Sequence, residues 1–130
     1  MIIKTGIDIV NINRIARVYD YYGDKFLNKV YTEEEIEYCL SKKHMQVNSF
    51  AKRFAGKEAF VKAIGEGFKN IAFHDIEILN DSKGAPFVQL EQPLYDYLQN
   101  KYKIETLKIS ISLSDDTDYA VASVVILGFK

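Results

Sequence analysis

The longest periodic segment of the chain, residues 47–64, constrains the fold most. Its apolar residues recur at three- and four-residue steps, the pattern of a helix that turns one stripe toward a core. The stripe consists of Val47, Phe50, Ala51, Phe54, Val61 and Gly65. Gly65 and Gly67 end the pattern, because glycine commonly terminates helices. The sequence therefore predicts one long helix as a main packing element.

Segments rich in β-branched residues surround this helix in the sequence. Residues 2–10 predict a strand that ends just before Asn11, a good helix N-cap. Further strands are predicted at residues 75–79, 86–90, 107–113 and 119–127, and further helices at residues 12–22, at 32–40 and from Pro93 onward. Together these elements indicate an α+β fold, with a largely antiparallel sheet packed against the long helix.

Composition limits the class of protein. The chain has 130 residues and 48% hydrophobic content, which fits one domain, and no linker or repeat divides residues 1–130. A net charge of −1 argues against a general nucleic-acid binder. Cys39 is the single cysteine, so it has no internal disulfide partner, and its helical spacing favours a buried apolar role. No apolar run is long enough to span a membrane, and we expect a cytoplasmic protein.

Glu58 is the informative anomaly of the long helix. It falls inside the apolar stripe, where a lone ionised carboxylate would be costly, so such a residue normally meets a cation, a metal or a hydrogen-bond network. Arg53 and Lys57 flank one side of the stripe and Lys62 flanks the other. One carboxylate among three cations suits a site for phosphate and metal. An ordinary i,i+4 ion pair between Glu58 and Lys62 at a solvated edge explains the pattern equally well.

Asp8 is a second carboxylate in an apolar setting, because it interrupts the β-branched strand at residues 7–10. Its ordinary role would be to cap a turn or the next helix. Two acidic residues from different elements, Asp8 and Glu58, suggest a shared site for a hard cation. Mg²⁺ is often held by one or two carboxylates together with substrate phosphates and water. The spacing in the sequence leaves open whether the two residues meet.

Several motifs follow one another along the chain. In order, they are Gly6-Ile7-Asp8-Ile9-Val10 with Arg14, Thr32-Glu33-Glu34-Glu35, Arg53-Phe54-Ala55-Gly56-Lys57-Glu58-Ala59, Lys62-Ala63-Ile64-Gly65-Glu66-Gly67, Gly84-Ala85-Pro86, Ile109-Ser110-Ile111-Ser112 and Ala120-Val121-Ala122. This ordered set resembles the holo-acyl-carrier-protein synthases, the short single-domain type of 4′-phosphopantetheinyl transferase. The resemblance implies the fold of that family and an enzyme of fatty acid biosynthesis. Such an enzyme transfers 4′-phosphopantetheine from coenzyme A to a serine of apo-acyl carrier protein and releases adenosine 3′,5′-bisphosphate.

The resemblance also implies roles for individual residues. Asp8 and Glu58 match the metal ligands of the family, for Mg²⁺, and Lys62 would stabilise the pyrophosphate, so these three form the catalytic set. Orienting a water that accepts the serine proton is a second candidate role for Glu58. Coenzyme A would be bound by Arg53, Lys57, Lys62, Gly65, Gly67, Gly84, Pro86, Ser110 and Ser112. On the sequence alone, the glycines and Pro86 are ordinary helix-cap and turn residues.

The first predicted helix, at residues 12–22, has a basic face. Arg14, Arg17 and Tyr21 share this face, and simple solvation is its ordinary explanation. The resemblance implies that this helix engages the acidic carrier protein, with charge acting on encounter rate and register. Members of the family also resemble subunits of a homotrimer with active sites at the subunit interfaces. We therefore expect coenzyme A, acyl carrier protein and two further copies of the chain as partners.

Leu113 departs from the family pattern, which usually has histidine after the serine of the closing strand. His44 and His74 lie in other segments and are most simply surface or loop residues. We expect weaker contacts at the nucleotide end of coenzyme A and an unaffected metal site. Leu113 also favours an alternative, a binding or regulatory module without turnover. A nucleotide-phosphate-binding domain unrelated to carrier proteins would explain the basic helix but not the ordered motifs.

Overall fold

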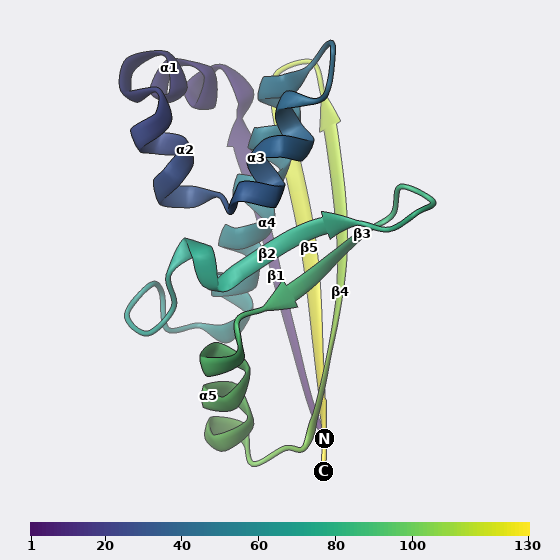
Figure 1. Cartoon of the computed structure of the whole chain (residues 1–130). Coiled ribbons are helices and arrows are strands. Elements are labelled where there is room, and N and C mark those ends of the chain that lie inside the picture. Colours follow the sequence, from purple (N-terminus) through teal and green to yellow (C-terminus); the bar gives the residue numbers. More distant parts are fainter.

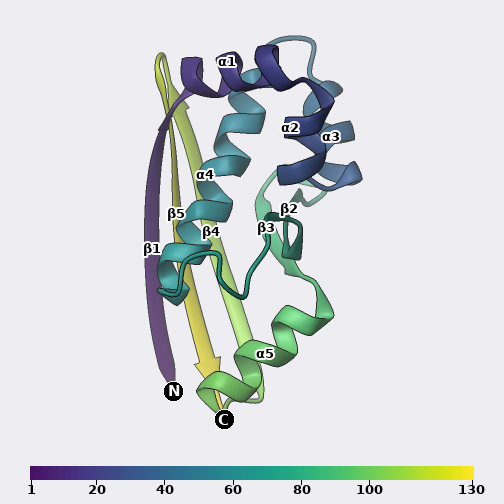
Figure 2. The same ribbon diagram turned by 90° about the vertical axis from the view of Figure 1, so that its left-hand side faces the viewer.

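A long helix lies along one face of an antiparallel sheet in the computed structural model, which describes all residues 1–130 (Figure 1). The helix is α4 (Gln46–Ile64). The sheet has the strand order β1 (Ile2–Asn11), β5 (Tyr119–Phe129), β4 (Thr106–Asp116). Figure 2 shows α4 running beside these strands, with both chain termini at the same end of the sheet. The predicted α+β fold and long helix are confirmed.

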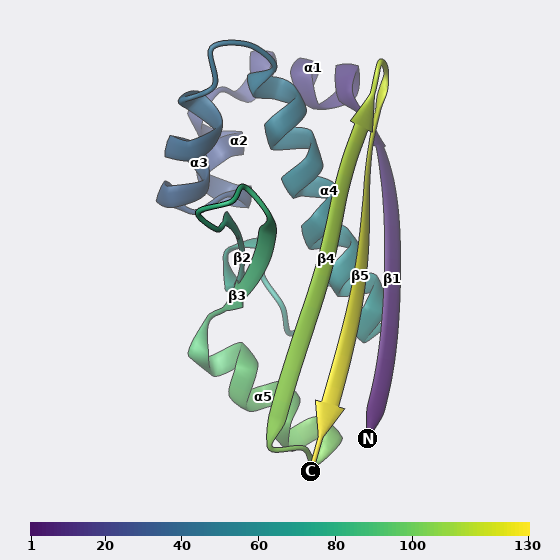
Figure 3. The same cartoon turned by 90° about the vertical axis from the view of Figure 1, so that its right-hand side faces the viewer.

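A second layer lies on the side of α4 away from the sheet (Figure 3). It contains α3 (Glu33–Leu40) and the hairpin of β2 (Ile76–Asn80) and β3 (Pro86–Leu90). The remaining elements are α1 (Ile12–Tyr22), α2 (Asp24–Val30), the 3₁₀ helix η1 (Phe73–Asp75) and α5 (Gln92–Tyr102). With a layer on each side, α4 buries 12 of its 19 residues, which is more than one apolar stripe.

Gly6 lets β1 pack directly on the backbone of α4. A Cβ atom at this position would overlap the carbonyl oxygen of Ala59 and would lie 2.8 Å from the amide nitrogen of Ala63. Only glycine allows a strand and a helix to approach so closely. The contact brings the inner face of β1, and Asp8 with it, to the surface of the helix.

Local signals in the sequence set the ends of several elements. Asn11 caps α1, because its Oδ1 accepts a hydrogen bond of 3.2 Å from the amide of Arg14. Thr32 and Glu35 form the predicted capping box at the start of α3. Gly65 ends α4 in the left-handed conformation. Helix α2 was not predicted, because its seven residues are too few for a clear period.

One face of the three-stranded sheet is covered by no other element (Figure 3). Ile3, Ile7 and Ile9 lie on this outer sheet face and are 60%, 63% and 62% exposed. Its other members include Thr5 on β1, Val121, Ser123, Val125 and Leu127 on β5, and Ser110 and Ser112 on β4. An exposed apolar patch of this kind marks an interaction surface. No helix of the chain combines the length and the apolar character needed to cross a membrane.

Candidate active site

Asp8, Glu58 and Lys62 come together between β1 and α4. Asp8 lies on the inner face of β1, and its Oδ1 accepts a hydrogen bond of 2.9 Å from Nζ of Lys62. Glu58 lies one turn before Lys62 on α4 and is partly buried. The ion pair of Lys62 is therefore with Asp8, and not the i,i+4 pair with Glu58 that the sequence left open. The structure brings the whole predicted catalytic set into one place.

The surroundings of Glu58 raise its pKa. Burial raises the pKa of the Glu58 carboxyl, and the nearby Asp8 carboxylate raises it further, while the cations Lys62 and Arg14 offset part of the effect. Two like charges held close together destabilise each other unless a cation joins them. A cation bound next to Glu58 would therefore favour its ionised form.

The donor set of this site fits Mg²⁺. Carboxylate oxygens are hard ligands, and Mg²⁺ in proteins usually takes one or two of them and completes its shell with phosphate oxygens and water. Asp8 and Glu58 supply two carboxylates, and the chain has no cluster of three or more His, Cys, Asp or Glu residues suited to a metal. A site with only two protein ligands leaves positions open for a phosphate-bearing substrate.

A cavity of about 280 Å³ opens beside the first half of α4. Arg53, Gly84 and Pro86, three of the residues predicted to bind coenzyme A, line it together with Leu113. The Arg53 guanidinium is almost fully buried and donates to Ser49 Oγ at 3.0 Å and to the side-chain oxygen of Asn80. The wall also includes Tyr38, Lys42, His44, Asn48, Lys52 and Asp115. The structure thus assembles a basic cavity next to the position where the sequence departs from the family.

One of these wall residues, Tyr38, was missed from the sequence. Tyr38 lies between two cations, because Lys42 Nζ and Arg53 Cζ are each 4.4 Å from the centre of its ring. Nothing in the predicted helix 32–40 marked this residue as functional. His44 is an exposed loop residue, as expected, and it also lines the cavity. The contact of Tyr38 with Arg53 depends on packing between α3 and α4, which has no local sequence signal.

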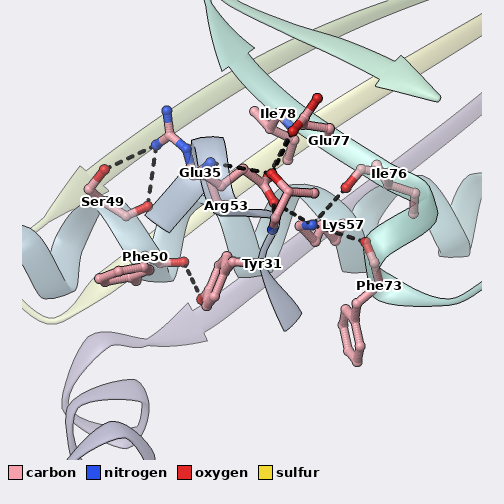
Figure 4. Close-up of polar contacts among 11 residues, drawn as sticks. Tyr31, Glu35, Ser49, Phe50, Arg53, Lys57, Phe73, Ile76, Glu77 and Ile78 are labelled. Carbon is pink, nitrogen blue, oxygen red and sulfur yellow. Dashed lines mark hydrogen bonds and ion pairs between the residues drawn. The ribbon is translucent and has the colours of Figure 1, made fainter. Parts of the chain in front are cut away.

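Lys57 does not reach the cavity or the carboxylates. Its side chain is fully buried, and its Nζ donates to Glu35 Oε1 at 2.7 Å and to the carbonyl oxygens of Phe73 and Ile76 at 2.9 and 2.6 Å (Figure 4). An ammonium group has three hydrogens, and each has a partner here. Burial lowers the pKa of Lys57, and Glu35 offsets part of this shift. The expectation that Lys57 holds coenzyme A phosphates is therefore corrected.

The burial of side chains on α4 differs from what the apolar stripe predicts. The stripe places Glu58 inside and puts Arg53 and Lys57 at its flank, but Arg53 and Lys57 are buried while Glu58 is only partly buried. The reason is that α4 is enclosed by the sheet on one side and by α3 and β2 on the other. A helix with two buried sides has no single polar flank.

The remaining predicted residues lie at the edges of the site. Gly65 and Gly67 follow α4 with φ of 87° and 66°, in an exposed turn just after Lys62. Ser110 and Ser112 lie on the outer sheet face, on the other side of the sheet from Asp8, so one chain alone does not bring them to the carboxylates.

The three residues predicted to bind the carrier protein are exposed on α1. They are Arg14, Arg17 and Tyr21, and Tyr21 is 81% exposed. Arg14 is close enough to the carboxylates to lower the pKa of Glu58. The basic face of α1 therefore adjoins the catalytic set.

Comparison with known proteins identifies the family. The family model described as "4′-phosphopantetheinyl transferase superfamily" matches residues 4–124. The chain belongs to this superfamily. A holo-[acyl-carrier-protein] synthase of Wolbachia pipientis subsp. Culex pipiens is 50% identical over 97% of this chain and 98% of that protein. A second, from Halothermothrix orenii, is 45% identical over 96% of this chain and 97% of that protein.

Solved members of the superfamily share the fold. The holo-[acyl-carrier-protein] synthase of Neisseria meningitidis has a TM-score of 0.84 at 34% identity and covers 95% of this chain and 97% of its own. That of Helicobacter pylori, solved in complex with coenzyme A, has a TM-score of 0.82 at 36% identity over 95% of this chain and 99% of its own. The resemblance drawn from the ordered motifs is confirmed.

Proposed function

We propose that this chain is a holo-[acyl-carrier-protein] synthase, which transfers 4′-phosphopantetheine from coenzyme A to a serine of apo-acyl carrier protein in support of fatty acid biosynthesis. The observation that carries the proposal is the meeting of Asp8, Glu58 and Lys62 between β1 and α4, in a chain of this superfamily. The free, buried thiol of Cys39 fits a reducing compartment, and we place the reaction in the cytoplasm.

Asp8 and Glu58 would hold the magnesium ion, which when bound neutralises charge on pyrophosphate oxygens. Lys62, paired with Asp8, stabilises the charge that develops as the pyrophosphate bond breaks. The serine oxygen forms a bond to the phosphorus that carries the pantetheine arm, and adenosine 3′,5′-bisphosphate leaves with the bridging oxygen. The serine proton passes to a water that Glu58 would orient.

One coenzyme A would take its two ends from neighbouring subunits. Its nucleotide end would occupy the cavity at Arg53 of one chain, and its pyrophosphate would lie near Lys62 and the turn at Gly65 of another. Nine residues separate Arg53 from Lys62, which is about two and a half helical turns, so the two side chains lie on opposite faces of α4. The expected homotrimer would bring these faces of different chains together.

Transfer of a fluorescent coenzyme A arm to apo-acyl carrier protein tests the function. We expect labelling of the carrier in the presence of Mg²⁺, loss of labelling with a chelator, and recovery when Mg²⁺ is restored. Asp8→Ala and Glu58→Ala should both abolish it. Folded protein that binds coenzyme A but labels no carrier would favour the alternative of a binding module without turnover. Folded protein that binds neither ligand would refute both.

The basic face of α1 should govern use of the carrier protein. Arg14→Glu is expected to raise the KM for the acidic carrier roughly tenfold, because it turns an attraction at the docking surface into a repulsion. The KM for coenzyme A should change by less than about twofold. Steady-state kinetics with each substrate varied in turn makes the comparison, with Lys103→Glu, a charge reversal at the end of α5, as the control. Equal effects on both substrates would contradict carrier docking at α1.

Leu113 should limit the affinity for coenzyme A. Leu113→His places a hydrogen-bond donor in the wall of the cavity near Arg53, and we expect the KM for coenzyme A to fall several-fold, by roughly 1 kcal/mol of binding. The KM for the carrier should stay the same. Leu113→Met, which keeps the volume and adds no donor, is the matched control. An unchanged KM for coenzyme A would remove Leu113 as the cause of weak binding.

The outer sheet face would be covered by two further copies of the chain in a homotrimer. Its exposed isoleucines support this assembly, and Ser110 and Ser112 on the same face would then approach the site of a neighbouring subunit. Ile7→Glu is expected to yield a monomer with little transfer activity, as measured by analytical ultracentrifugation and carrier labelling. Asn28→Glu, an exposed change on α2, should leave the trimer intact. A wild-type monomer with full activity would contradict the assembly.

A further inference from the structure

The buried ion pair of Glu35 and Lys57 has no part in the mechanism above. Both side chains are fully buried. Glu35 Oε1 accepts hydrogen bonds from the amide of Thr32 at 2.9 Å and from Lys57 at 2.7 Å, and its Oε2 accepts one of 2.9 Å from the amide of Ile78. Every polar atom of the pair is therefore satisfied inside the fold.

The partners of this pair fix strand β2 against helix α4 (Figure 4). Lys57, on α4, donates to the carbonyl oxygen of Ile76, and Glu35, on α3, accepts from the amide of Ile78. Both partners are backbone atoms of the same strand, two residues apart. Because a strand cannot slide past such bonds without breaking both, the pair sets the register of β2.

Strand β2 leads from the ion pair to the cavity wall. It ends at Asn80, whose side chain accepts from Arg53 and donates to the carbonyl oxygen of Gly84 at 3.0 Å. Gly84 and Pro86 line the cavity together with Arg53. On the helix side, Lys57 lies one turn after Arg53 and directly before Glu58. The pair therefore joins the two walls of the cavity through a short, hydrogen-bonded path.

We infer that Glu35 and Lys57 are positioning residues that set the width of the cavity for the nucleotide end of coenzyme A. The inference rests on the proposed function, because coenzyme A is its ligand. Stability alone does not account for the pair, since well-packed apolar residues are often as stabilising as a buried ion pair. Apolar packing does not fix the register of a strand, whereas the two hydrogen bonds to the backbone of β2 do.

The test removes both charges together. Lys57→Met alone would leave the buried charge of Glu35 without a partner. The variant is therefore Glu35→Gln with Lys57→Met in the full chain. We expect the Kd for adenosine 3′,5′-bisphosphate, from calorimetry, and the KM for coenzyme A to rise roughly tenfold, because a small misplacement of a binding wall is costly. The kcat and the KM for the carrier should stay within about twofold. Ile126→Val, a core change on the sheet side of α4, is the control for general destabilisation.

A double-mutant cycle distinguishes a positioning role of Glu35 and Lys57 from general destabilisation of the fold. Pro86→Gly weakens the hairpin wall directly, and its effect on the Kd should largely disappear in the Glu35/Lys57 double variant, because that wall is already displaced. Additive effects, an unchanged Kd, or a Kd raised as much by Ile126→Val would overturn the inference. Wild-type protein that binds the bisphosphate but labels no carrier would refute the transferase function and leave the positioning test intact.

Discussion

Glu58→Gln is expected to lower the rate of phosphopantetheine transfer by a factor of about 10³ while the fold stays intact. The amide keeps the size of the side chain but removes one of the two carboxylates beside Lys62, so Asp8 alone would remain to hold Mg²⁺. Burial and Asp8 raise the pKa of Glu58, which means that its ionised form is disfavoured in the folded chain. Removing that charge should leave the free energy of unfolding the same or slightly increased.

Carrier labelling over a range of Mg²⁺ concentrations, together with thermal unfolding, measures both effects. Glu37→Gln, an exposed position on α3, is the matched control and should keep full activity. Wild-type labelling rates in Glu58→Gln would show that this carboxylate neither binds the metal nor assists the proton transfer. A large fall in the melting temperature would instead point to a structural role.

Gly6→Ala should have the second largest effect, on stability and activity together. The added Cβ would meet backbone atoms of α4 at Ala59 and Ala63, and a helix backbone cannot move aside as a side chain can. Strand β1 must then withdraw from the helix, at a cost of about 3 kcal/mol or more in the free energy of unfolding. Because Asp8 lies on the same face of β1, its distance from Glu58 would grow and Mg²⁺ binding would fail.

Urea unfolding measures the stability loss, and carrier labelling at a temperature where the variant is folded measures the activity. Gly128→Ala provides a graded comparison, because its Cβ would meet only side-chain atoms of Ile104 and Ile2, at 2.7 Å each. Those side chains can rotate, so the loss should be smaller and transfer should persist. Equal losses in the two variants would show that the contact between β1 and α4 is not what positions Asp8.

Features set by a few neighbouring residues could be predicted from the sequence. The capping box of Thr32 and Glu35 and the helix-ending Gly65 depend on backbone hydrogen bonds within one turn, so residue type and spacing were sufficient. Asp8 interrupts an apolar strand, and the ordered family motifs paired it with Glu58. The antiparallel pairing followed from the order of strands and turns. The strands β4 and β5 only proved longer than predicted, with a tighter turn between them.

The environment of α4 could not be predicted in the same way. The period of a helix shows which residues share a side, but it does not show how many sides are covered. For that reason Lys57 was expected at the flank of the stripe as a ligand of coenzyme A, whereas it forms a buried ion pair with Glu35, 22 positions away in the sequence. The basic cavity could not be predicted from the sequence either, because Tyr38, Asn80 and Leu113 reach it from separate segments. Such sites depend on tertiary packing, which leaves no local pattern.

The strand order of the large sheet has a consequence for the order in which the protein folds. Strand β5 lies between β1 and β4, although it follows every other element along the chain. During synthesis β1 leaves the ribosome first and has no strand partner until β5 emerges, so its backbone hydrogen-bonding groups stay unpaired in the meantime. Until then Asp8 is held by contacts with α4 alone. Catalytic competence should therefore arise in one late step of folding, and nascent chains should be inactive until that step.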